Sequence, residues 1–137
     1  MTHLSTDFRV AVNRLSRTLR AQKADSTMSD AVFSALARLH REGPLSLADL
    51  SRHEGVTPPS MTKTVAALVE LGLATKADHG DDRRKVLIAT TPAGADFVVE
   101  TRRRRDDWLT PRLAVLTPAE RRVLTEATDI MRRLAQP

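Results

Sequence analysis

The 137-residue sequence is long enough for one domain with a buried core, and its 41% hydrophobic residues argue against a disordered chain. It contains no cysteine, which excludes disulfides, thiol redox sensing and cysteine zinc sites. With no run of about 18 apolar residues and no basic-then-apolar amino terminus, it predicts neither a membrane span nor a secretion signal, and we expect a cytoplasmic protein.

The charge favours an acidic partner but does not show where that partner binds. The formal net charge is +5 and the sequence pI is about 10.6. Residues 44–94 nevertheless carry six basic and six acidic side chains, so this segment is neutral overall. A nucleic-acid surface in it must therefore depend on where its charges point.

Helices are predicted along most of the chain. The first lies at about 4–22, and its apolar stripe consists of Leu4, Phe8, Val12, Leu15 and Leu19. The others are predicted at 28–42, 47–54 and 58–71, from Pro92 onward, and at 118–135. Three of them begin with a hydroxyl N-cap followed by proline, at Thr57, Thr91 and Thr117.

The centre of the chain has the order typical of a winged helix-turn-helix. The short helix at 47–54 is followed by Gly55, which favours a turn, and then by the helix at 58–71. Residues 73–78 and 85–90 have the pattern of two paired strands joined by a loop. The predicted fold is mainly α with a small β-hairpin wing. Such a fold fits one helix into a DNA major groove and sets the hairpin beside it.

The helix that begins at Pro58 is predicted to be the reading helix. The side chains expected to point inward are Leu50, Val56, Met61, Val65 and Leu68. Helical spacing then leaves small, hydroxylated and basic residues outside, which can bond phosphates and base edges near a helix N-terminus that favours a phosphate. The alternative is an ordinary surface helix with solvated hydroxyls. The predicted DNA contacts on this helix are Thr57, Pro59, Ser60, Thr62 and Lys63.

The predicted hairpin tip is basic. Arg83, Arg84 and Lys85 follow Asp81 and Asp82 at the end of the loop. The carboxylate of Asp82 can hold Arg84 in one orientation, so that its planar guanidinium fits a narrow minor groove. The alternative is a solvated turn whose ion pairs contribute less than about 1 kcal/mol. We expect the three basic residues to contact DNA and Asp82 to orient the wing.

The outer helices have apolar stripes that a compact winged helix does not need. A second copy related by a two-fold axis is the commonest partner for such faces. Packing of both helices on the central module of their own chain is the alternative. The residues expected in a dimer interface are Leu4, Phe8, Leu15, Trp108, Leu116, Val123 and Ile130.

The helix predicted from Pro92 contains a proline and a basic run. Pro111 lies where the helix should continue, so we expect a kink, or a restart with Thr110 as the cap. The arginines at 102–105 are expected to form a solvated face paired with Asp106 and Asp107. A role toward the DNA backbone or another anion is the alternative.

Two motifs are similar to those of a known family. Asp82-Arg83-Arg84 matches a D-x-R wing, and Thr91-Pro92-Ala93-Gly94 matches an L-T-x-x-G pattern, with Thr90 in place of the usual apolar residue. With these motifs the chain resembles the MarR family of winged-helix transcriptional regulators over essentially its whole length. The resemblance implies a single MarR-type domain at 1–137, with a DNA-binding lobe at 28–91 (reading helix about 58–71, wing about 73–90) and a helical dimerisation region at 1–24 and 92–137.

The resemblance also implies a function. It implies an obligate homodimer that binds a pseudo-palindromic operator in double-stranded DNA and acts as a repressor released by a small phenolic or anionic ligand. No cofactor is expected, and the sequence does not identify ligand-binding residues. A winged-helix module that binds protein is an alternative, disfavoured by the basic wing. An architectural DNA binder without an effector is another.

Enzymatic and metal chemistry are not expected. The sequence lacks a glycine-rich phosphate loop, a G-x-S-x-G elbow and an H-E-x-x-H helix. A metal site at His79, Asp81 and Asp82 is disfavoured because hairpin tips are exposed.

Overall fold

The computed structural model describes residues 2–25, 27–79 and 82–136, with the backbone alone for residues 2, 78–79 and 82–85. Within this part the elements are α1 (Thr2–Arg20), α2 (Asp30–Glu42), β1 (Leu45–Ser46), α3 (Leu47–Glu54), α4 (Pro58–Glu70), β2 (Ala74–His79), β3 (Asp82–Thr90), α5 (Pro92–Ala114) and α6 (Pro118–Ala135). The expected fold class, mainly α with a small β-hairpin wing, is confirmed.

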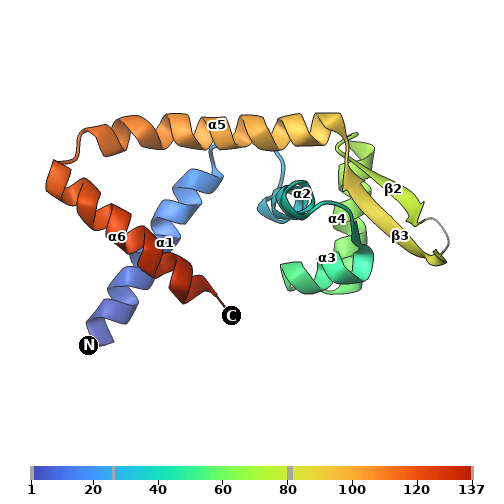
Figure 1. Ribbon diagram of the computed structural model, residues 1–137, viewed down its shortest axis with the longest axis horizontal. Coiled ribbons are helices and arrows are strands. Elements are labelled where there is room, and N and C mark those ends of the chain that lie inside the picture. Colours follow the sequence, from blue (N-terminus) through green and yellow to red (C-terminus); the bar gives the residue numbers. More distant parts are fainter. Residues whose placement is uncertain (1, 26, 80–81, 137) are drawn as a thin grey trace.

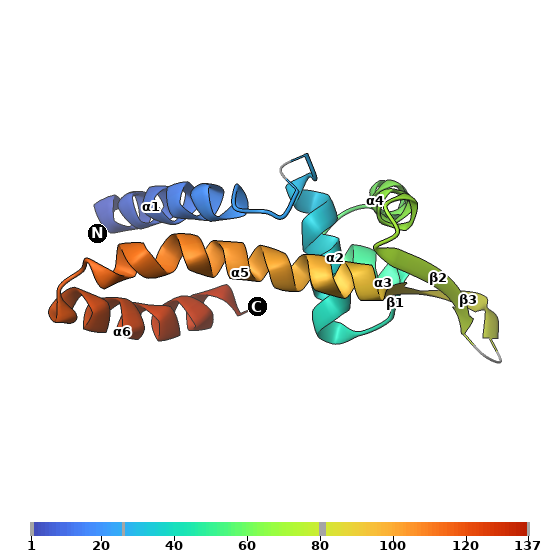
Figure 2. The same ribbon diagram turned by 90° about the horizontal axis from the view of Figure 1, so that it is seen from above.

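The longest helix, α5, joins two groups of elements (Figure 1). Where α5 begins, α2, α3, α4 and the β2–β3 hairpin lie together. At its other end α1 and α6 lie below α5 in Figure 1, and Figure 2 shows them on opposite sides of it. Neither α5 nor any other helix in the described ranges is long and apolar enough to cross a membrane.

The buried core lies where α2, α3, α4 and the sheet meet the start of α5. Its fully buried large apolar side chains are Leu36, Leu39, Leu50, Met61, Val65, Leu68, Ile88 and Val98. Four of the five residues predicted to point inward are in this set. The prediction for Val56 is wrong, because its side chain is 38% exposed. It lies in the turn after Gly55, whose φ of +66° is left-handed, and belongs to neither helix.

The sheet has one strand that the sequence pattern did not predict. Its order is β1-β3-β2, with both pairs antiparallel. The added strand β1 has two residues, and Leu45 pairs with Ile88. The last strand of the wing also begins earlier than expected, at Asp82 instead of residue 85.

The three helix starts predicted at a threonine followed by proline are confirmed, whereas α1 begins at Thr2 and α2 at Asp30 instead of about residues 4 and 28. The side chains of Thr57, Thr91 and Thr117 each accept a hydrogen bond from the backbone N–H three residues on. At Thr117 the Glu120 carboxylate completes a capping box by accepting a hydrogen bond from the Thr117 backbone N–H. This hydrogen bond lowers the pKa of Glu120 below its usual value. Proline at the first helical position then follows each threonine, where its missing N–H costs no helical bond.

Helix α5 continues through Pro111, so the predicted restart at Thr110 is wrong. A proline inside a helix removes one hydrogen bond to the carbonyl four residues earlier. In the same turn the Arg112 guanidinium donates to the Trp108 carbonyl oxygen at 2.6 Å. The helix ends at Ala114, only three residues beyond the proline.

Hydrogen bonds join the start of α5 to the turn that follows α4. The Thr91 hydroxyl donates to the Gly72 carbonyl oxygen at 2.7 Å, and its backbone N–H donates to the Leu73 carbonyl oxygen at 3.0 Å. Gly94 permits this approach, because a Cβ there would lie 2.0 Å from the Leu73 carbonyl oxygen. The glycine of the L-T-x-x-G pattern is thus required by close backbone packing.

Gly94→Ala should lower the free energy of unfolding by about 1–3 kcal/mol, since the added methyl forces the backbones apart. Gly55→Ala is the control: its Cβ meets nothing within 4 Å, but its φ of +66° is left-handed. That variant should lose about 1–2 kcal/mol through backbone strain alone. Urea denaturation measures both. A Gly94→Ala protein as stable as the parent would contradict the packing described here.

Candidate nucleic-acid interface

The N-terminal half of α4 presents a narrow polar surface. Met61, Val65 and Leu68 are buried on its inner side. All five predicted DNA contacts on this helix are exposed: Thr57, Pro59, Ser60, Thr62 and Lys63. The structure therefore brings them together on one accessible face, as helical spacing predicted.

Two hydroxyls on this face already make local hydrogen bonds. Thr57 Oγ1 accepts from the Ser60 backbone N–H at 3.3 Å, and Thr62 Oγ1 donates to the Pro58 carbonyl oxygen at 2.9 Å. In this rotamer Thr62 offers its oxygen lone pairs and its methyl group to a ligand, while its proton is engaged. Ser60 and Lys63 are thus the exposed donors on this helix that face outward without such a bond in the described part of the chain.

The wing projects beside α4 (Figure 1). Strands β2 and β3 pair from Ala74 with Thr90 to His79 with Asp82, and the register shifts between Asp78 and His79. The backbone of residues 82–85 belongs to β3, but the side chains of Asp82, Arg83, Arg84 and Lys85 lie outside the described part. The roles predicted for these four side chains therefore lie outside the described residues. The disfavoured metal site at His79, Asp81 and Asp82 lies outside them too.

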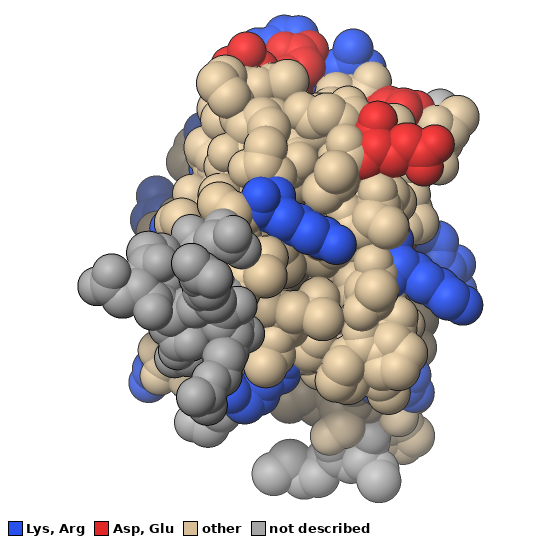
Figure 3. Space-filling model, turned by 90° about the vertical axis from the view of Figure 1, so that its right-hand side faces the viewer, with Lys and Arg blue, Asp and Glu red and all other residues tan. Residues whose placement is uncertain are grey.

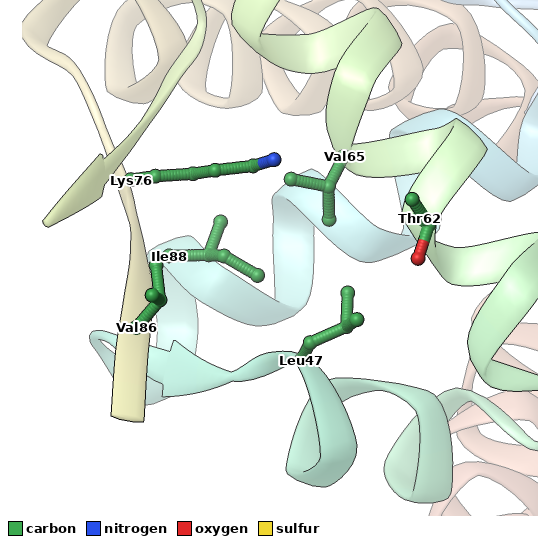
Figure 4. Close-up of a pocket in the computed structure, with 6 residues that line it drawn as sticks. All are labelled: Leu47, Thr62, Val65, Lys76, Val86 and Ile88. Atoms are coloured by element: carbon green, nitrogen blue, oxygen red, sulfur yellow. The ribbon is translucent and has the colours of Figure 1, made fainter. Parts of the chain in front are cut away.

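A cavity of about 230 Å³ separates the reading helix from the wing (Figure 4). Its lining residues are Leu47, Thr62, Val65, Lys76, Val86 and Ile88. Figure 4 shows the Lys76 side chain extending from β2 across the cavity toward Val65 of α4. The floor is apolar, so the lysine ammonium is the charged group at this site.

Lys76 is a candidate functional residue that sequence reasoning missed. The signal was present in the alternation of the strand, since Lys76 lies two residues after the buried Ala74 and so on the same face. Lys63 and Lys76 form no ion pair with any side chain that the structure describes, whereas Arg52 and Arg38 pair with Asp49 and Glu54. No described acidic side chain therefore occupies either lysine, and both ammonium groups can bind an external anion.

The described charged side chains on this end of the molecule are scattered (Figure 3). Basic side chains lie apart from one another on a mostly uncharged surface, and the acidic ones gather toward the upper edge of the view. This agrees with the neutral balance of residues 44–94. Any binding of an anion here depends on individually placed cations and on hydrogen bonds.

The far end of α5 carries a second, apolar surface. Five predicted interface residues are strongly exposed: Leu4 at 69%, Phe8 at 40%, Leu15 at 50%, Val123 at 62% and Ile130 at 48%. Trp108 and Leu116 are half-buried. An apolar groove of about 440 Å³ lies between α1 and α6, lined by Leu4, Ser5, Phe8, Ala127, Ile130, Met131 and Leu134. None of the α6 residues is buried.

Comparison with known proteins places the chain among DNA-binding regulators. The model of the MarR family matches residues 28–86, which span α2, α3, α4 and most of the wing. An uncharacterized HTH-type transcriptional regulator of Mycobacterium bovis is 41% identical over 128 residues, covering 93% of this chain and 90% of that protein.

Solved structures show the same fold. The crystal structure of RV1404 from Mycobacterium tuberculosis has a TM-score of 0.87 at 27% identity and covers 100% of this chain and 96% of that one. A mutant of MepR from S. aureus bound to an oligodeoxyribonucleotide has a TM-score of 0.71 at 17% identity, over 96% of this chain and 97% of that one. The protein thus belongs to the MarR family of winged helix-turn-helix transcriptional regulators, which bind DNA and are not enzymes.

Proposed function

We propose that this regulator is a homodimer that binds a pseudo-palindromic operator and represses transcription until a small ligand releases it. In this proposal residues 28–91 are the DNA-binding lobe, and residues 1–24 and 92–137 form the dimerisation region. The observation that carries it is α6, a helix with no buried residue and an apolar face rich in large side chains. Such a face is stabilised only when another apolar surface covers it.

The dimer is supported by the shape of the exposed apolar surface. The groove between α1 and α6 lies at the end of α5 opposite the wing, so a second copy seated there leaves α4 free. In a two-fold dimer the same surface is used by both copies. Two α4 helices would then face one duplex, with half-site centres roughly 34–36 Å apart.

DNA contact is divided among the reading helix, the wing and the space between them. Ser60, Thr62 and Lys63, with Thr57 and Pro59 at the helix start, enter the major groove. The wing cations Arg83, Arg84 and Lys85 take the minor groove, with Asp82 orienting Arg84. The sugar–phosphate backbone runs between the two grooves, and Lys76 stands at that place, over an apolar cavity beside α4.

Release by a ligand is supported by a surface hollow of about 640 Å³ between the end of α1 and α5. Its lining includes Trp108, one carboxylate and four basic side chains: Asp107, Lys23, Arg103, Arg104 and Arg112. The Arg112 guanidinium carbon lies 4.0 Å from the centre of the Trp108 ring. An aromatic surface beside cations suits a phenolic acid, whose carboxylate pairs with arginine while its ring stacks.

Loss of a DNA cation tests the interface. Arg84→Ala should weaken operator binding by about tenfold or more with little change in stability, since it removes a minor-groove contact. Lys76→Met should weaken binding uniformly across sequences and reduce the salt slope by about 0.9, as expected for one lost phosphate contact. Arg102→Met, an exposed charge on α5, is the control. Gel shifts at several salt concentrations in which Lys76→Met matches the control would exclude the backbone contact.

Ile130→Glu tests the dimer. Light scattering at low micromolar concentration should report a dimer for the parent and a monomer for the variant, because a carboxylate in an apolar interface is costly to desolvate. Leu71→Glu changes an apolar side chain that is 54% exposed at the end of α4, and it should remain dimeric. A monomeric parent protein would remove the basis of the proposal.

The ligand is tested through the single tryptophan of the chain. Titration with a hydroxybenzoate should quench Trp108 fluorescence and weaken operator binding over the same concentration range. Arg112→Met should abolish both effects, since it removes the cation at the ring. Operator affinity that no phenolic acid alters would favour the architectural DNA binder without an effector.

A further inference from the structure

Three helices meet at the middle of α5, where Arg105 lies. Its Nε donates to the Leu19 carbonyl oxygen in the last turn of α1 at 3.2 Å. Its guanidinium carbon lies 4.7 Å from the centre of the Phe33 ring, which is buried in α2. One side chain of α5 therefore contacts both α1 and α2. The expectation that the arginines at 102–105 form a solvated face is wrong for Arg105, which is half-buried.

The neighbouring arginines behave differently. Arg103 and Arg104 are exposed and pair with Glu100, and Arg103 also pairs with Asp107. The hydrogen bonds from Arg103 and Arg104 lower the pKa of Glu100 to about 2, whereas Asp106, expected to pair with this run, forms no ion pair with a side chain that the structure describes. Arg104 also donates to the Lys23 carbonyl oxygen at 3.4 Å, but Arg105 contacts a backbone carbonyl and an aromatic ring and forms no ion pair with a described side chain. Its pKa is lowered from its usual value mainly by burial, which agrees with a guanidinium withdrawn from water.

A second contact lies one helical turn earlier on α5. Thr101 is fully buried, and its Oγ1 accepts from the Ala24 backbone N–H at 3.2 Å. Ala24 belongs to the connector between α1 and α2, whose Lys23 Nζ in turn donates to the Met28 carbonyl oxygen at 2.5 Å and to Asp30 at 3.0 Å. The connector is thus held to α5 on one side and to the start of α2 on the other.

We infer that Arg105 and Thr101 are positioning residues that fix the reading lobe relative to the dimerisation helices and so set the spacing of half-sites that the protein accepts. The inference rests on the proposed dimeric DNA-binding function. Helix α1 belongs to the proposed interface and α2 to the reading lobe, and these two residues join them through α5. One added base pair moves the two half-sites apart by about 3.4 Å and rotates one against the other by about 35°, so only a loose joint lets both reading helices follow altered spacing.

The arginine is suited to this role in a way that lysine is not. Its planar group can stack on the Phe33 ring and donate in its own plane at the same time, whereas an ammonium is a compact, strongly hydrated charge. Arg105→Lys therefore keeps the positive charge and removes the planar guanidinium that both stacks and donates. Thr101→Val keeps the shape and removes the acceptor for the Ala24 N–H, and Thr101→Ser restores that acceptor.

The test uses the full chain and an operator selected from random duplexes, rebuilt with one or two base pairs added between its half-sites. The parent protein should prefer the selected spacing by at least about tenfold, as for a mismatched site. Arg105→Lys and Thr101→Val should reduce that preference to about threefold or less while light scattering still reports dimers. Thr101→Ser, and Arg102→Lys as an exposed control, should keep the preference of the parent.

The outcomes separate the inference from the function beneath it. A parent protein that is monomeric, or that binds no duplex, would overturn the proposed function. A dimeric parent that discriminates spacing, with both Arg105→Lys and Thr101→Val discriminating equally well, would overturn the inference alone, as would a parent indifferent to spacing. If Arg105→Lys fails to fold, Thr101→Val and Thr101→Ser test the inference instead. The measured quantity is again the ratio of affinities for the selected and the altered spacing.

Discussion

One chain provides too little apolar surface to cover the apolar faces of α1 and α6. Leu134 is 68% exposed and Leu4 69%, and they line the same groove. Transfer of such side chains out of water is worth about 1.5–3 kcal/mol each, so several of them provide a large driving force for association. The proposed dimer follows from this constraint, because a second copy of the same chain supplies an identical apolar surface.

Helix α5 connects that surface to the DNA-binding end through a series of fixed contacts. At its start, Gly94 lets the helix approach the Leu73 carbonyl, so α4 and the wing are held at one end. At its middle, Thr101 and Arg105 hold the connector and the end of α1. Its final turns lead into the α6 surface. The placement of the reading helix relative to the proposed dimer axis is thus determined along a single helix.

Among the side chains that the structure describes, the face formed by α4 and the wing carries few charges. The ion pair of Arg38 with Glu54 joins α2 to α3, with 21% of the Arg38 side chain and 8% of the Glu54 side chain exposed. Arg38 has a pKa above its usual value, chiefly because it donates to the Glu54 carboxylate. In the proposed interface, the placement of Lys63, Lys76 and the wing residues takes the part that a broad basic patch has in other DNA-binding proteins.

Much of the fold could be predicted because its signals are local. The caps at Thr57, Thr91 and Thr117 and the apolar periodicity fixed helix starts and faces, so the helices at 47–54 and 118–135 were predicted with the bounds observed. Strand β1 was missed, because two residues have no periodicity and the strand exists only through pairing with β3.

The candidate site was less predictable because it depends on packing between elements. The reading face of α4 followed from spacing alone. Arg105 was predicted to be solvent-exposed because a run of arginines is typical of the solvated face of a helix. Only the packing of α1 and α2 against α5 shows otherwise. Strand alternation places Lys76 on the same face as the buried Ala74, but the residue was overlooked because its proposed role depends on the neighbouring α4.

The absence of cysteine makes one direct measurement possible. A single cysteine introduced at Glu70, the exposed last residue of α4, carries one spin label per chain. Electron double resonance on the operator-bound protein should then give one narrow distance distribution, offset from the half-site separation of roughly 34–36 Å because Glu70 lies about 9 Å from the centre of α4. No dipolar coupling, or a broad distribution that DNA does not narrow, would show that two copies do not present their reading helices together.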